Sequence, residues 1–90
     1  MTNMQEVKVL RMQVHDALRL LESSNLSALM KNTLHVAVKK VDRITISAFL
    51  KFEYGDEMYY KNMAEICETL PEGSSSHMEL LSYHLKNLQS

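Results

Sequence analysis

The sequence predicts an all-α protein, a small four-helix bundle in which the first two helices form a long antiparallel hairpin. Three observations favour this class. The 90 residues include only two glycines and one proline, so few turns are expected. Apolar residues recur three and four positions apart in several segments, which places their side chains on one face of a helix. Residues 26–54 contain neither glycine nor proline and are predicted to form the longest helix.

The first helix is expected over residues 3–22, where the apolar spacing is regular and no helix breaker occurs. Its core stripe consists of Val7, Leu10, Val14, Ala17 and Leu21. The following Ser23-Ser24-Asn25 is expected to end this helix, because short polar side chains readily bond to nearby backbone groups. The chain should turn there into the second helix.

Residues 26–54 permit two interpretations. A continuous helix would place one stripe of apolar residues, four and three positions apart, toward the core; the stripe consists of Met30, Leu34, Ala37, Val41, Ile44 and Ala48. The alternative is an α+β fold with a β-hairpin near 33–53. Apolar residues occupy every second position over residues 44–54, as in a half-buried strand, and the region is rich in β-branched side chains. Its strands would lie near 33–40 and 43–53. The helix accounts for the apolar or polar character of more residues than the hairpin does. A hairpin would also need a tight turn, and no Asn-Gly or Asp-Gly pair is present there.

Two shorter helices are expected after Gly55, which can adopt the left-handed backbone that ends a helix. One should run from Asp56 to about Thr69, before Pro71. The other should begin near Ser76, with Glu79 three residues later as in a capping box. Its apolar stripe consists of Met78, Leu81, Leu85 and Leu88.

We interpret residues 1–90 as a single helical domain, since this length supports one modest core. The segment Gly-Ser-Ser-Ser-His-Met suggests an alternative, because glycine and serine make flexible spacers and Ser-His-Met is the remnant of a common cloning site. In that case residues 1–72 form a helical domain, residues 73–77 a linker, and residues 78–90 a tethered helical peptide.

Composition narrows the classes of function. A net charge of −1 gives no overall attraction to nucleic acid or to anionic membranes. The single cysteine, Cys67, excludes an intrachain disulfide and is expected to be a buried structural thiol. The N-terminus lacks the apolar run of a signal peptide, and no apolar stretch is long enough to cross a bilayer. We therefore expect a cytoplasmic protein with no membrane segment.

No residue pattern indicates catalysis. The four histidines, His15, His35, His77 and His84, never lie three or four positions apart, so no helix presents two of them to one metal ion. Neither a glycine-rich phosphate loop nor a nucleophile elbow is present. We expect no enzymatic activity, no metal, no cofactor and no small-molecule substrate.

The most informative feature is a set of apolar residues that point away from the predicted core stripes. We predict that these residues form a protein interface: Val9, Met12, Leu20, Val36, Ile46, Leu50 and Tyr54. Alternatively, a shorter helix covers part of this surface. The predicted function is a non-catalytic helical interaction module, an adaptor, chaperone or regulator, that forms a homodimer or binds a protein partner. On this interpretation Leu50→Glu weakens association and leaves helicity intact.

An alternative function is nucleic-acid binding through a basic face of the central helix. Lys39, Lys40 and Arg43 could follow a phosphate backbone there. Asp42 and Glu53 dilute this face, and no aromatic residue is interleaved with the basic ones. Nucleic acid is therefore the less favoured partner.

Overall fold

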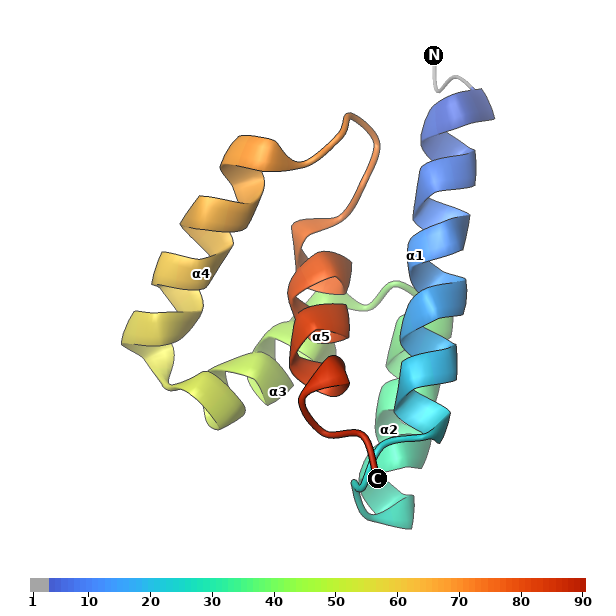
Figure 1. Cartoon of the computed structure of the whole chain (residues 1–90), viewed down its shortest axis with the longest axis vertical. Coiled ribbons are helices and arrows are strands. Elements are labelled where there is room, and N and C mark those ends of the chain that lie inside the picture. Colours follow the sequence, from blue (N-terminus) through green and yellow to red (C-terminus); the bar gives the residue numbers. More distant parts are fainter. Residues whose placement is uncertain (1–3) are drawn as a thin grey trace.

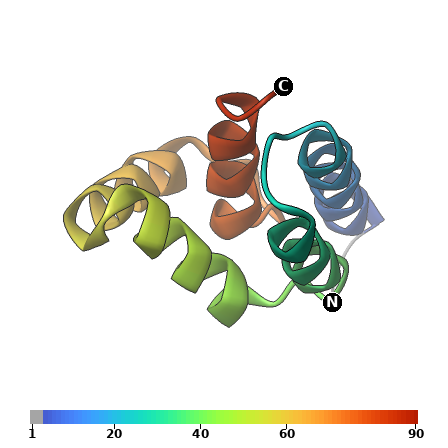
Figure 2. The same cartoon turned by 90° about the horizontal axis from the view of Figure 1, so that it is seen from below.

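The protein consists of five α-helices, with α5 packed against α1, α3 and α4, in a computed structural model that describes the backbone of residues 4–90 and the side chains of residues 8–90 (Figure 1). The helices are α1 (Met4–Glu22), α2 (Ala28–Lys39), α3 (Arg43–Tyr54), α4 (Asp56–Thr69) and α5 (Ser76–Lys86). Seen from below, α5 lies between the α1–α2 pair and the α3–α4 pair (Figure 2). Residues 4–90 contain no strand, only an isolated bridge between Ser24 and Gln89. The all-α class is confirmed, and the α+β alternative is wrong.

The four-helix prediction is wrong because residues 26–54 form two helices instead of one. The backbone of α2 ends in a Schellman turn: the Asp42 amide donates to the Ala37 carbonyl at 2.8 Å, and the Val41 amide donates to the Val38 carbonyl at 3.1 Å. This turn places Val41 in the left-handed region, at φ 51°. A left-handed backbone costs a β-branched residue about 1–2 kcal/mol, and glycine usually occupies this position.

Asp42 begins α3 as its N-cap. Its Oδ1 accepts hydrogen bonds from the amides of Ile44 at 3.1 Å and Thr45 at 3.2 Å, and Oδ2 accepts one from the Thr45 hydroxyl at 2.7 Å. These bonds, the Thr45 hydroxyl foremost, hold the pKa of Asp42 below its usual value, because they favour the carboxylate. An aspartate followed three residues later by a threonine was thus the sequence signal for a helix start within residues 26–54.

The other predicted boundaries among the described residues agree with the structure to within one or two positions, and the predicted start of the first helix at residue 3 lies outside the described residues. The turn at Ser23–Asn25 separates α1 from α2, which begins after the N-cap Ser27. Gly55, at φ 82°, separates α3 from α4 without a side-chain cap. The side chain of Ser75, one residue before the predicted start, caps α5 by accepting from the Met78 amide at 3.3 Å.

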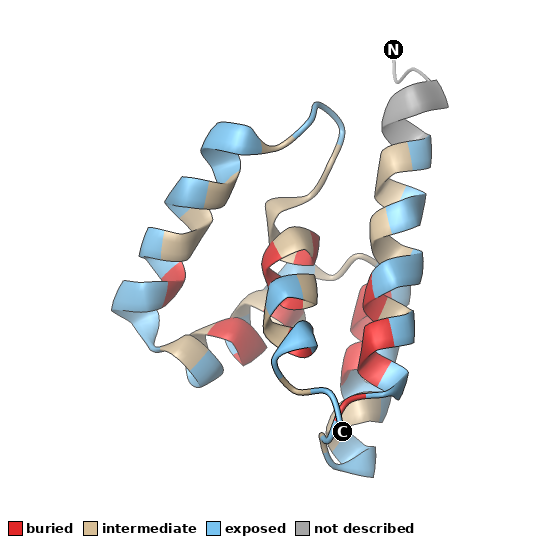
Figure 3. Ribbon diagram, viewed as in Figure 1, coloured by how far each residue is buried: buried red, intermediate tan, exposed pale blue. Residues whose placement is uncertain are grey.

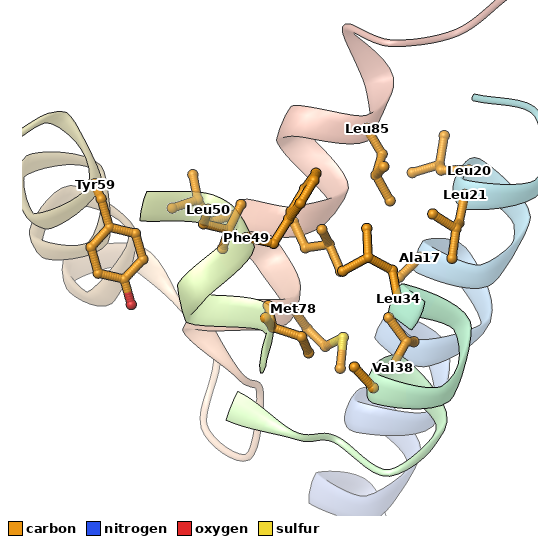
Figure 4. Packing of buried hydrophobic residues seen from close by; sticks show 14 residues of the cluster. Ala17, Leu20, Leu21, Leu34, Val38, Phe49, Leu50, Tyr59, Met78 and Leu85 are labelled. Carbon is orange, nitrogen blue, oxygen red and sulfur yellow. The ribbon is translucent and has the colours of Figure 1, made fainter. Parts of the chain in front are cut away.

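The core fills the space between α5 and the α1–α2 pair and continues to α3 (Figures 3 and 4). Its buried members include Ala17 and Leu21 of α1, and Leu34 and Val38 of α2. The largest share from one helix comes from α5, which contributes Met78, Leu80, Leu81 and Leu85. Tyr59 is the one buried residue of α4, so α4 is anchored mainly near its N-terminal end. No helix among the described residues combines the length and apolarity that crossing a bilayer demands.

Polar bonds hold both ends of α5 against α1 and the turn after it. At the first end, the Gln13 amide pairs with the Ser75 backbone: Oε1 accepts from the Ser75 amide at 2.8 Å and Nε2 donates to the Ser75 carbonyl at 3.1 Å. At the other end, Nε2 of Gln89 donates to the Leu20 carbonyl at 3.0 Å, and the Asn25 amide donates to the Leu88 carbonyl at 2.7 Å. Segments more than sixty residues apart are therefore joined at both ends of α5.

Candidate functional site

The seven residues of the predicted interface occupy different environments (Figure 3). Leu20, Ile46 and Leu50 are buried in the core. Val9 and Tyr54 are half-buried, while Met12 on α1 and Val36 on α2 are exposed. The three buried residues are unavailable to a partner, which corrects their assignment as contact residues.

Leu20, on α1, belongs to the same core cluster as Ala17 and Leu21 of the predicted stripe. The error at Ile46 and Leu50 has a different cause. The sequence interpretation carried the phase of one helix through residues 40–42, where the structure turns the chain into a new helix. The inner and outer faces of α3 are therefore exchanged relative to the prediction. Ile46 and Leu50 point inward with no exposed surface, whereas Ile44 of the predicted core stripe is 83% exposed.

The exchange creates an apolar surface that the sequence analysis missed. Ile44, Ala48 and Phe52 lie four residues apart on α3 and are all exposed, Phe52 to 84%. We call these three residues the outer ridge. A single exposed apolar side chain is common on a protein surface. Two large ones on the same helix face form an apolar patch, and such patches commonly mark an interface.

The side chains of Lys51 and Glu53 on α3 are directed away from the outer ridge. The Lys51 amine lies 5.4 Å from the Tyr59 ring centroid and 5.1 Å from the Tyr60 ring centroid, so it reaches toward α4. Oε1 of Glu53 lies 3.5 Å from Nε2 of His84, so that carboxylate reaches toward α5. The residues between Arg43 and Lys51 are uncharged. A partner that covers the ridge would therefore desolvate little charge.

A polar network connects α3, α4 and α5 behind the ridge. The Tyr59 hydroxyl lies 2.9 Å from the Ser47 hydroxyl, which donates to it, and 3.1 Å from Nε2 of His77. Burial, followed by the nearby charge of Arg43, lowers the pKa of His77. The network supports the orientation of α3, and with it the ridge.

The lowered pKa of His77 predicts that stability falls on acidification. The unfolded chain, with a histidine pKa of about 6.5, binds more protons than the folded chain. The contribution of His77 is therefore fully present above about pH 6.5 and is lost as the pH falls through the lowered folded value. We expect the melting temperature to drop less between about pH 7.5 and pH 5.5 in His77→Gln than in the unmodified chain. His35→Gln, at an exposed histidine, is the control and should keep the full drop.

The residues proposed for nucleic-acid contact lie at the corner between α2 and α3. Lys39, Lys40 and Arg43 are all exposed there, as expected for a solvated basic face. The Asp42 carboxylate lies among them, with both oxygens bonded to its own helix cap. The three basic residues follow the chain around one corner and do not line either of the two clefts described next.

A cleft of about 590 Å³ lies between α4 and α5. Its lining is largely apolar or aromatic, with Ile66 and Leu70 from α4 and its end, and Leu80 and Tyr83 from α5. Tyr54 also lines the cleft, and burial raises the pKa of its hydroxyl. The charged lining residues are Glu65 and Glu79. We call this the α4–α5 cleft.

A second cleft, of about 580 Å³, lies between α1 and α2 and has a different character. Its lining includes Arg19, Lys31 and two histidines, His15 and His35. The Lys31 amine already donates to the Glu22 carbonyl at 3.1 Å, and Arg19 lies 3.9 Å from Asp16. Its basic groups are thus partly engaged within the protein.

The described residues do not bring three potential metal-ligating side chains together. Cys67 is exposed, so its prediction as a buried thiol is wrong. The orientation of α4 explains the difference: Met63 and Ile66 pack against the core, and Cys67 follows on the outer side. The structure thus presents apolar surfaces and clefts for binding.

Comparison with known proteins adds no relative. No family model matches the chain, and neither a curated protein nor a solved structure matches it.

Proposed function

We propose that the chain is a small helical protein-interaction module that self-associates through the outer ridge and acts without catalysis as an adaptor or regulator. The observation that supports this proposal is the exposure of Ile44 and Phe52, each above four-fifths, on either side of Ala48 on one helix face. The ridge replaces the seven-residue surface expected from the sequence.

A second copy of α3 is the occupant that the ridge fits best. Ile44 and Phe52 are each four positions from Ala48, so a two-fold axis at Ala48 brings Ile44 of one copy level with Phe52 of the other. The small Ala48 side chain at the centre permits the two helix axes to approach to about 8 Å. Because the ridge itself is uncharged, this arrangement brings no like charges together along it.

The expected dimer is weak. Burying the four large side chains of two ridges contributes roughly 6–12 kcal/mol, at about 1.5–3 kcal/mol for each. Association itself costs about 4–15 kcal/mol. The net gain is therefore at most about 8 kcal/mol, which corresponds to a dissociation constant of about 1 μM, and we expect a weaker, transient dimer on the order of 0.1 mM.

Sedimentation equilibrium from about 0.02 to 1 mM tests the proposal, since this range spans the expected dissociation constant. Phe52→Glu should weaken the dimer at least about tenfold, because it places a charge in the apolar contact. The dimer of the unmodified chain should change little between low and high salt, as expected for an apolar interface.

Leu29→Glu is the matched control. Leu29 is also strongly exposed, at 78%, but it lies at the start of α2, the end farther from α3. This variant should dimerise as the unmodified chain does. A chain that remains monomeric at 1 mM, or a dimer that Phe52→Glu leaves intact, would contradict the proposal.

A further inference from the structure

We propose that the α4–α5 cleft binds a basic amphipathic helix of another protein. The cleft differs in place and character from the outer ridge, because its lining comes from α4, α5 and the segments at their ends, with no ridge residue among it. It therefore provides a second binding surface, independent of self-association.

The shape of the cleft follows from the way α4 is attached. Tyr59 is buried near the start of α4, whereas Met63, Ile66 and Leu70 farther along are only half-buried. The C-terminal half of α4 is thus less completely covered than its start, and the cleft lies between this half and α5. The resulting space of about 590 Å³ is in the size range of ligand pockets, roughly 300–1,000 Å³. This space is large enough for several side chains of a partner.

Two apolar stripes face the cleft from opposite sides. Ile66 and Leu70 are four positions apart at the end of α4, and Leu80 and Tyr83 are three positions apart on α5. A groove between two helices with apolar walls accepts the apolar face of a third helix, whose anchors recur at the same three- and four-residue spacing. Tyr83 is 57% exposed and provides an aromatic contact at the rim.

The electrostatics of the cleft select a basic partner. Glu65 and Glu79 are the charged residues of the lining, and no lysine, arginine or histidine accompanies them. The C-terminal end of α4, at Thr69 and Leu70, also lines the cleft and has no basic residue in its last turn. The partial negative charge of a helix C-terminus therefore adds to that of the two carboxylates. Lysine or arginine beside the apolar anchors of a partner would complement both.

Three labelled synthetic peptides of about four turns, with anchors spaced three and four apart, test the proposal against the full chain by fluorescence anisotropy. The first has leucine anchors flanked by lysine, the second replaces lysine with glutamate, and the third is a shuffled version of the first without an apolar stripe. We expect the lysine peptide to bind at least about tenfold more tightly than either of the others, with affinity that falls as salt rises.

Variants of the protein locate the binding site. Glu65→Gln should weaken binding of the lysine peptide about threefold, and Tyr83→Ala about fivefold. The matched controls are Glu68→Gln and Tyr60→Ala, exposed residues of α4 that lie outside the cleft lining. These two control variants should bind the lysine peptide as tightly as the unmodified chain does.

Other outcomes overturn the proposal. Equal affinity for the lysine and glutamate peptides, or binding that Glu65→Gln and Tyr83→Ala leave unchanged, would exclude this cleft as a site for a basic helix. Octylammonium binding as tightly as the lysine peptide would assign the cleft to small cationic amphiphiles. Loss of self-association in Tyr83→Ala would show that a second copy fills the cleft.

Discussion

Leu50→Glu is expected to unfold the protein. Leu50 has no exposed surface and packs in the core between α3 and its neighbours (Figure 4). A carboxyl group placed there either stays charged without a partner or becomes protonated, and a buried site shifts its pKa by up to about 3–5 units, or about 4–7 kcal/mol. The lost leucine contributes about 2–3 kcal/mol more. This total approaches the stability of a domain of this size, about 5–13 kcal/mol.

Far-ultraviolet circular dichroism and urea unfolding check this result, with Phe52→Glu as the control. The two sites are two residues apart on α3, but Phe52 is on the outer ridge and 84% exposed. We expect Phe52→Glu to change the free energy of unfolding by less than about 1 kcal/mol. Helicity retained in Leu50→Glu and lost in Phe52→Glu would show that the two faces of α3 are assigned in reverse, as the sequence first suggested.

Removal of residues 76–90 is expected to abolish cooperative folding. This segment contributes four buried side chains, Met78, Leu80, Leu81 and Leu85, worth roughly 6–12 kcal/mol at about 1.5–3 kcal/mol each. It also supplies the Glu79 carboxylate, which accepts from Nε2 of Gln13 at 3.2 Å, and the bonds to the turn after α1. Residues 1–75 alone should give a broad, non-cooperative melt and bind a hydrophobic dye.

Cleavage of the loop provides the control for this truncation. A protease site placed at Gly73, which is exposed, breaks the chain and leaves α5 complete. The two fragments should remain associated, because the α5 contacts do not depend on the loop. A cooperative melt of residues 1–75 would instead favour the alternative division into a helical domain of residues 1–72, a linker and a tethered peptide.

The helical class and most boundaries were predictable because they depend on local sequence. Polar residues at 23–25 and Gly55 each end a helix for reasons found within a few residues of the chain. The break at Val41 was not predictable in this way, since a β-branched residue rarely adopts a positive φ. Only the Asp42–Thr45 pair indicated it.

The candidate site was less predictable than the fold, because the position at which a helix begins decides which of its residues face the core. Residues such as Ile44 and Leu50 are equally apolar, and a change of phase at Val41 decides which of them reaches the core. The α4–α5 cleft depends on how two helices are placed relative to each other in space, which no local sequence pattern records. Its acidic lining combines Glu65 and Glu79, which belong to different helices.

The central position of α5 has a consequence for synthesis on the ribosome. Residues 76–90 are made after α1 to α4, of which α1, α3 and α4 contact α5, at about 5–20 residues per second. For about one to three seconds, the nascent chain therefore has apolar stripes on α1, α2 and α3 without the helix that covers them. In that interval the uncovered apolar stripes can bind chaperones or aggregate, until α5 packs over them.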